Sequence, residues 1–138
     1  MNQQTSAPAD RPAIHLVAVE CDLLEALALS AERKHPQSSA MLLAELDRAK
    51  VCEPGELPAH TVTMNSLIEF VDEGTGAHRS VQLVYPPDAD IAAGRVSVLT
   101  PVGAGLIGMT AGASIRWPTR EGHDRILRIV SVKPPRQD

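Results

Sequence analysis

The side chains that usually catalyse reactions are all present in this 138-residue chain, but no local motif brings them together. A nucleophile triad needs Ser or Cys with a His and a carboxylate, and the chain lacks a signature such as the G-x-S-x-G elbow. Metal sites usually show at least one close pair of ligands. The five histidines are instead scattered, one in each segment: His15, His35, His60, His78 and His123. The sequence therefore predicts no catalytic centre, no cofactor and no bound metal.

One glycine motif, Gly103 to Gly108, matches the G-x-G-x-x-G pattern letter for letter. It follows a predicted strand and opens a predicted helix, as a dinucleotide-binding fingerprint does. However, this helix is very short, and the sequence shows no βαβ unit with a parallel sheet, which dinucleotide binding requires. We therefore interpret these glycines as positions where a short helix packs closely on the sheet.

Asp88 and Asp90 form a carboxylate pair in a loop stiffened by Pro86 and Pro87. Two interpretations stay open from the sequence. The loop is either an ordinary solvated turn or an acidic surface loop that binds a partner.

The composition is that of an ordinary globular protein, with 43% hydrophobic and 22% charged residues. Aromatic residues make up only 2%, so the core must consist of Leu, Ile, Val and Ala. The net charge of −4 argues against broad nucleic-acid binding, because a phosphate backbone needs a basic face. We predict no direct sequence-specific contact with nucleic acid.

Two cysteines, Cys21 and Cys52, are too few for a disulfide framework and indicate reduced thiols. The first ten residues lack the pattern of a signal peptide. No apolar run approaches the roughly 20 residues that a membrane span needs. We therefore expect a cytoplasmic protein without a membrane partner.

Helical spacing dominates the first part of the chain. We expect a disordered leader over residues 1–13 and a short helical hairpin over residues 14–53, entered through an apolar segment, Ile14–Val19, that is a short strand or extended. Asp22 is a plausible cap for the first helix, and Pro36 ends it. The second helix is expected to start near Ser38 or Ser39, with Glu45 on its polar side. Helices of about 12 residues are only about 18 Å long.

The spacing changes from helical to alternating after a proline-containing linker over residues 54–60. A long strand is predicted from Val62 to Phe70, followed by a hairpin turn at Asp72–Gly76. Thr100 followed by Pro101 predicts the start of a short helix. Further strands are expected at residues 81–85, 96–99, 115–117 and 125–132. Residues 61–138 are therefore expected to form an antiparallel sheet with one short helix, which makes the chain an α+β protein.

Several of these segments together resemble the GreA/GreB transcription elongation factor family, in particular its branch of regulators of nucleoside diphosphate kinase. The matching segments are Glu45–Ala49, Val62–Ser66, Leu83–Pro86 and Val96–Gly108. The resemblance implies an N-terminal antiparallel coiled-coil finger and a C-terminal domain with an FKBP-like fold. It also implies a partner, bacterial RNA polymerase, with the C-terminal domain on the rim of the secondary channel and the finger entering it.

The resemblance also implies which residues face the polymerase. The expected contact is the strand-to-helix corner Leu99, Thr100 and Pro101, and the loop of Asp88 and Asp90 is a weaker candidate. Leu99 stands where cleavage factors of the family often carry an acidic residue. Ala113 likewise replaces an aspartate that is usual in the family.

The tip of the finger departs from the pattern of the cleavage factors, whose acidic fingertip helps to hold a catalytic magnesium ion. The expected tip consists of Glu32, Arg33, Lys34 and His35, which is one carboxylate beside two cations. Magnesium sites are built from oxygen ligands, mainly carboxylates. We therefore hypothesise that the protein competes for the channel entrance without stimulating transcript cleavage.

Two other classes of function stay open. The apolar hairpin is compatible with an adaptor for another protein or with a homo-oligomer. An FKBP-like fold also raises prolyl isomerase activity, but fold does not imply function. That activity uses an apolar pocket rich in aromatic rings, and only Phe70, Tyr85 and Trp117 are available.

Overall fold

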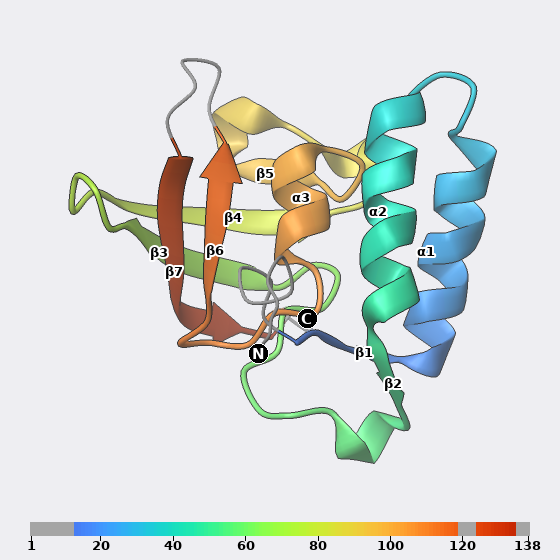
Figure 1. Cartoon of the computed structure of the whole chain (residues 1–138), viewed down its shortest axis with the longest axis horizontal. Coiled ribbons are helices and arrows are strands. Elements are labelled where there is room, and N and C mark those ends of the chain that lie inside the picture. Colours follow the sequence, from blue (N-terminus) through green and yellow to red (C-terminus); the bar gives the residue numbers. More distant parts are fainter. Residues whose placement is uncertain (1–12, 119–123, 135–138) are drawn as a thin grey trace, which may run out of the picture.

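The computed structural model describes residues 13–118 and 124–134. It is a mixed α+β structure in which a pair of helices stands beside a five-stranded sheet (Figure 1). The helices and strands are, in chain order, β1 (His15–Val17), α1 (Ala18–Ser30), α2 (Pro36–Arg48), β2 (Lys50–Cys52), β3 (Leu67–Asp72), β4 (His78–Val84), β5 (Arg95–Ser97), α3 (Pro101–Leu106), β6 (Ser114–Pro118) and β7 (Asp124–Lys133). Residues 13–118 and 124–134 also contain three short 3₁₀ turns: η2 (Pro54–Glu56), η3 (Pro86–Asp88) and η4 (Ile91–Ala93). The predicted leader, apart from residue 13, lies outside the described residues.

The five-stranded sheet has the order β5-β4-β3-β7-β6. Its pairs are antiparallel except β4 with β5, which run parallel. The prediction of an antiparallel sheet was therefore wrong at this edge. A tight hairpin gives antiparallel neighbours, whereas a crossover gives parallel ones. The segment between β4 and β5, with its two 3₁₀ turns, is such a crossover.

The first helix starts earlier than its sequence pattern indicates. Helix α1 begins at Ala18, where β1 ends, and no side chain caps it, so the predicted cap at Asp22 was wrong. The reason is tertiary, because β1 pairs in parallel with β2, a strand that the sequence pattern did not indicate. The strand fixes the backbone up to Val17, and the helix follows without an intervening loop.

The second helix also starts earlier than predicted. Helix α2 begins at Pro36, with proline in its first turn, so neither Ser38 nor Ser39 caps it. Proline suits this position because its missing N–H would have no partner in the first turn anyway. Ser39 is instead fully buried. Each helix has 13 residues, or about 20 Å, close to the predicted length.

The predicted long strand from Val62 to Phe70 is interrupted. Asn65 adopts a left-handed conformation with φ of 70°, and β3 starts only at Leu67. The hydroxyl of Ser66 accepts a hydrogen bond from the backbone N–H of Thr63, which closes a local turn. The alternating apolar residues of this segment are nevertheless all buried: Val62, Met64, Ile68 and Phe70.

One hydrophobic core includes residues from the helix pair and from the sheet. Helix α2 contacts both α1 and α3 and lies between them (Figure 1). Its central side chains are buried: Ser39, Leu42, Glu45 and Leu46. Glu45 was predicted to face solvent, but it is only 5% exposed and pairs with Arg48 at 2.8 Å. The error has a simple cause, since a helix covered on two sides buries a wider arc than one amphipathic stripe.

None of the helices in residues 13–118 and 124–134 has the length and apolar character that a membrane crossing needs.

Candidate functional site

The corner between β5 and α3 is held by a compact set of hydrogen bonds centred on Ser97. The backbone N–H of Leu99 donates to the Ser97 hydroxyl at 3.0 Å, and the Thr100 hydroxyl donates to the Ser97 carbonyl at 2.7 Å. The backbone N–H of Val98 donates to the Val84 carbonyl at 2.9 Å, which ties the corner to β4. The chain direction at this corner is therefore fixed by several bonds at once.

Thr100 caps α3 as its sequence predicts. Its hydroxyl oxygen accepts a hydrogen bond from the backbone N–H of Gly103 at 3.1 Å, and Pro101 occupies the first turn. Such a cap is worth about 1 kcal/mol. Pro101 is exposed and Thr100 half-buried, but Leu99 is only 9% exposed and belongs to the core. Of the three predicted contact residues, Pro101 is the exposed one and Leu99 lies in the core.

The glycine motif has the packing role that its sequence context indicated. A Cβ atom on Gly103 would overlap the Ser97 carbonyl oxygen and lie 2.7 Å from the Val98 Cα. A Cβ atom on Gly108 would lie 2.9 Å from the Cβ of Ile14, and Gly108 has φ of 80°. The first glycine thus lets α3 pack on β5, and the last one lets the N-terminal segment approach. The prediction that the short helix packs closely on the sheet is confirmed at Gly103, whereas Gly108 serves the contact with the N-terminal segment.

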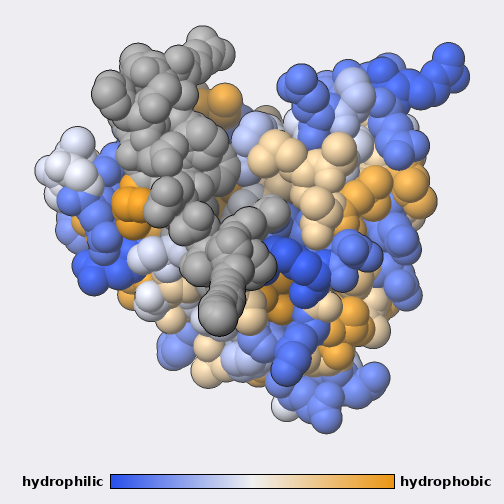
Figure 2. All heavy atoms as spheres, viewed as in Figure 1, coloured by the Kyte–Doolittle hydropathy of each residue, from blue (hydrophilic) through white to orange (hydrophobic). Residues whose placement is uncertain are grey.

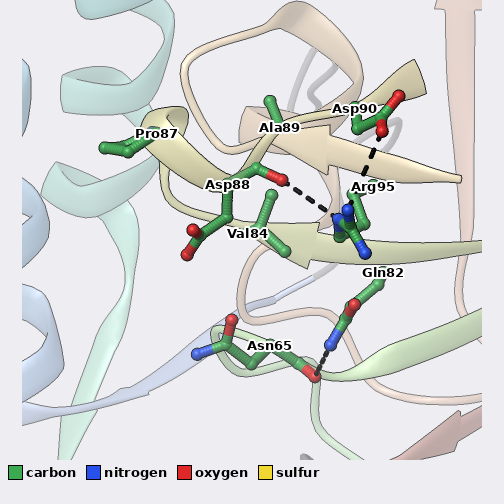
Figure 3. A pocket seen from close by; sticks show the side chains of 8 residues that line it. All are labelled: Asn65, Gln82, Val84, Pro87, Asp88, Ala89, Asp90 and Arg95. Carbon is green, nitrogen blue, oxygen red and sulfur yellow. Dashed lines mark hydrogen bonds and ion pairs between the residues drawn. The ribbon is translucent and has the colours of Figure 1, made fainter. Parts of the chain in front are cut away.

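An open hollow of about 440 Å³ lies beside the predicted acidic loop (Figure 3). Arg95 donates to the Asp88 carbonyl at 3.1 Å and lies 3.8 Å from the Asp90 carboxylate. The carboxylates of Asp88 and Asp90 remain exposed. Figure 3 shows the Asp88 side chain pointing away from Arg95, on the side of Asn65. The complete lining consists of Asn65, Gln82, Val84, Pro87, Asp88, Ala89, Asp90 and Arg95.

Strand β5 places the hollow and the corner next to each other. Its first residue, Arg95, lines the hollow, and its last residue, Ser97, starts the corner. Two residues of extended chain span about 7 Å. The structure thus brings together the two surfaces that were predicted separately, the Leu99–Pro101 corner and the loop of Asp88 and Asp90.

The predicted finger tip lies apart from β1 and β2, at the far end of the helix pair (Figure 1). Its four residues, Glu32, Arg33, Lys34 and His35, are all exposed. The helix pair does not extend away from the sheet domain, because α2 packs along α3. A tip held in this way has little reach beyond the rest of the molecule.

Glu20, which the sequence pattern did not single out, connects the helix pair to the sheet domain. One of its carboxylate oxygens accepts a hydrogen bond from the backbone N–H of Met64 at 3.3 Å. The other oxygen is buried without a hydrogen-bond partner. Burial raises the pKa of Glu20, although the bond from Met64 acts in the opposite direction. The charged form of this side chain is therefore disfavoured in the folded protein.

We expect the Glu20→Gln variant to gain stability relative to the parent protein as the pH rises. Burial raises the pKa of Glu20 in the folded protein. The stability that Glu20 contributes is therefore fully present below its ordinary pKa of 4.5 and is lost as the pH rises through the raised pKa. Glutamine keeps an acceptor for Met64 and carries no charge. Urea unfolding at about pH 4 and pH 7 measures the difference, with Glu25→Gln on the exposed face of α1 as the control. If Glu20→Gln is less stable than the parent protein at pH 7, the hydrogen bond from Met64 to the carboxylate outweighs the cost of burying its charge.

The described residues contain no group of three or more His, Cys, Asp or Glu side chains placed to hold a metal ion. Cys21 and Cys52 are free thiols and both are partly buried. Burial, followed by the charges of Asp22 and Glu25, raises the pKa of Cys21 and so lowers its reactivity. The side chain of Trp117 lies outside the described part of the chain.

Comparison with known proteins places the second half of the chain in a family. The family model described as "Transcription elongation factor, GreA/GreB, C-term" matches residues 57–134. This range contains the corner, the hollow and the glycine motif.

Individual relatives extend the similarity to the helix pair. A regulator of nucleoside diphosphate kinase from Escherichia coli (strain K12) is 40% identical over 92 residues, covering 67% of this chain and 68% of that protein. A transcription elongation factor GreA from Acidiphilium cryptum (strain JF-5) is 32% identical over 132 residues, covering 90% of this chain and 83% of that protein. Among solved structures, a prokaryotic transcription elongation factor GreA/GreB from Nitrosomonas europaea superposes with a TM-score of 0.72 at 36% identity. That match covers 90% of this chain and all of the other.

Proposed function

The chain belongs to the GreA/GreB family of transcription elongation factors, and from this premise we propose that it binds RNA polymerase at the rim of the secondary channel. The family consists of transcription factors and regulators, so the chain is not an enzyme in its own right. The proposed activity is therefore a binding activity that changes how the polymerase works.

The observation that carries this proposal is the rigid, exposed corner at the start of α3. Pro101 lies on the surface while the residues on both sides of it are fixed by the Ser97 and Thr100 hydrogen bonds. A preorganised contact loses little conformational freedom on binding, which favours affinity. The neighbouring hollow, with exposed Asp88 and Asp90, supplies a polar rim beside it.

The finger supports binding without cleavage. Its helices are about 20 Å long and α2 packs along α3, so the tip cannot project as far as a long coiled coil. The tip offers one carboxylate, Glu32, beside Arg33 and Lys34. Since magnesium requires oxygen ligands, this tip is poorly suited to hold the ion. We infer that the protein occupies the channel entrance and excludes cleavage factors from it.

The proposal includes two finer structural expectations. One is an FKBP-like arrangement of residues 61–138, separated from the helix pair by the linker at residues 54–60. The other is coiled-coil packing between α1 and α2. We do not propose prolyl isomerase activity, because Phe70 is buried in the core and Tyr85 packs against the core.

Binding to core RNA polymerase tests the proposal directly. We expect Pro101→Asp to weaken binding at least tenfold, because it places a charge in the centre of the proposed contact while the first turn of a helix tolerates Asp. Pro54→Asp is a matched control, since Pro54 is also exposed and starts a short helical turn. Surface plasmon resonance with purified core enzyme measures both variants. If the parent chain fails to bind the polymerase, the proposed function is wrong; if both variants bind equally well, the corner is not the contact.

A further inference from the structure

Helix α1 is unusual in being apolar on both its inner and its outer side. Leu24 and Ala28 are fully buried against the core. On the other side, Val19, Leu23 and Leu29 are 64%, 57% and 52% exposed. Exposed apolar residues gathered on one face often mark an interaction site. Figure 2 shows apolar surface, in orange, on the side of the molecule that α1 forms.

The exposed apolar residues of α1 are neighbours on the helix surface. Val19, Leu23, Ala26 and Leu29 follow each other at spacings of four, three and three residues, and all four are exposed. Residues three or four apart lie side by side on a helix. We call these four residues the α1 stripe.

The charged residues of α1 itself are all negative, and the turn that follows it carries the exposed Arg33 and Lys34. Helix α1 contains Glu20, Asp22 and Glu25 but no Lys or Arg. Asp22 and Glu25 are exposed and adjoin the stripe, with Asp22 three residues from Val19 and Glu25 four residues from Leu29. Such a surface complements a partner that combines apolar side chains with positive charges.

A second copy of this chain fits the α1 stripe poorly. Two copies of α1 facing each other would bring Asp22 and Glu25 close to the same residues of the other chain, and like charges repel. A 13-residue helix about 20 Å long and 10 Å wide offers on the order of 200 Å² on one face. Stable dimers bury about 800 Å² on each partner, so the α1 stripe alone is too small for one. An area of this size suits a weak contact with a single helix, and the like charges make that helix one of a different protein.

We propose that the α1 stripe is a docking surface for an amphipathic helix of a partner protein, with apolar residues at three- and four-residue spacing and Lys or Arg beside them. This surface is separate from the proposed polymerase contact, since α2 lies between α1 and α3 (Figure 1). The two contacts use different residues, so binding at the α1 stripe does not cover the corner. The protein would then connect a second factor to the complex that its corner binds.

Synthetic peptides test this proposal without polymerase. The probe is a peptide of about 14 residues, or four helical turns, with Leu at three- and four-residue spacing and Lys beside the Leu positions. One control peptide has Glu in place of Lys, and another has the same composition with the Leu spacing scrambled. We expect the Lys peptide to bind at least tenfold more tightly than either control and to shift the amide resonances of α1 in NMR spectra.

Two substitutions in the protein locate the binding surface. Leu23→Gln is expected to weaken binding of the Lys peptide about tenfold, since a buried Leu contributes strongly to such a contact. Ile91→Gln is the matched control, because Ile91 is 87% exposed but lies in η4, and it should leave binding unchanged. The proposal is overturned if the Lys peptide fails to bind or if Leu23→Gln binds it normally. It is also overturned if sedimentation shows a dimer that Leu23→Gln dissociates, because a second copy would then cover the stripe.

Discussion

Gly103→Ala is expected to destabilise the fold by about 3 kcal/mol, at the upper end of what overpacking a core costs. The new Cβ atom would overlap the Ser97 carbonyl oxygen and lie 2.7 Å from the Val98 Cα. Both clashes are with backbone atoms, so no side chain can rotate away to relieve them. Helix α3 must instead move off β5, which opens the core around Ala104 and Leu106. Denaturant unfolding followed by circular dichroism measures the loss.

Gly55→Ala is the matched control for this prediction. Gly55 lies in η2 with nothing within 4 Å of the added atom, so the change should alter stability by less than about 0.5 kcal/mol. Gly103→Ala should also weaken polymerase binding under conditions where it is still folded, because moving α3 displaces Thr100 and Pro101. A variant that is as stable as the parent protein would contradict the close packing of α3 on β5.

Transcript cleavage in backtracked complexes is expected to stay at its intrinsic rate when this protein is added. In the same assay, an excess of the protein should reduce cleavage stimulated by a GreA-type factor at least tenfold. The physical reason lies at the finger tip, where Arg33 and Lys34 repel a magnesium ion and Glu32 alone supplies a carboxylate. Gel analysis of the shortened RNA measures both effects.

Two variants separate the causes of this result. Pro101→Asp should lose the inhibition, because it no longer occupies the channel entrance. A double variant, Arg33→Asp with Lys34→Asp, should still not stimulate cleavage, because the helix pair remains about 20 Å long and packed along α3. Robust cleavage with the parent protein would refute binding without cleavage. Cleavage with the double variant alone would show that charge, rather than reach, is what the finger lacks.

Local patterns in the sequence determined much of this protein. The cap of Thr100 and the proline after it predicted the start of α3, and the turn at Asp72–Gly76 predicted the hairpin between β3 and β4. The glycine motif predicted a close approach of α3 to the sheet. These features depend on residues within a few positions of each other, so their physical causes can be read directly from the chain. The family resemblance likewise rested on short segments in the right order, and the comparisons confirm it.

Only the tertiary structure decided which distant segments meet. The pairing of β1 with β2 moved the start of α1 to Ala18, and the crossover after β4 made β5 a parallel neighbour. The bond between Glu20 and Met64 spans 44 positions, which no local pattern reports. The burial of Leu99 and the proximity of the corner to the Asp88 and Asp90 loop have the same origin, since both follow from where β5 lies. Spacing and caps act within a turn or a strand, whereas these contacts depend on how the completed elements pack around one core.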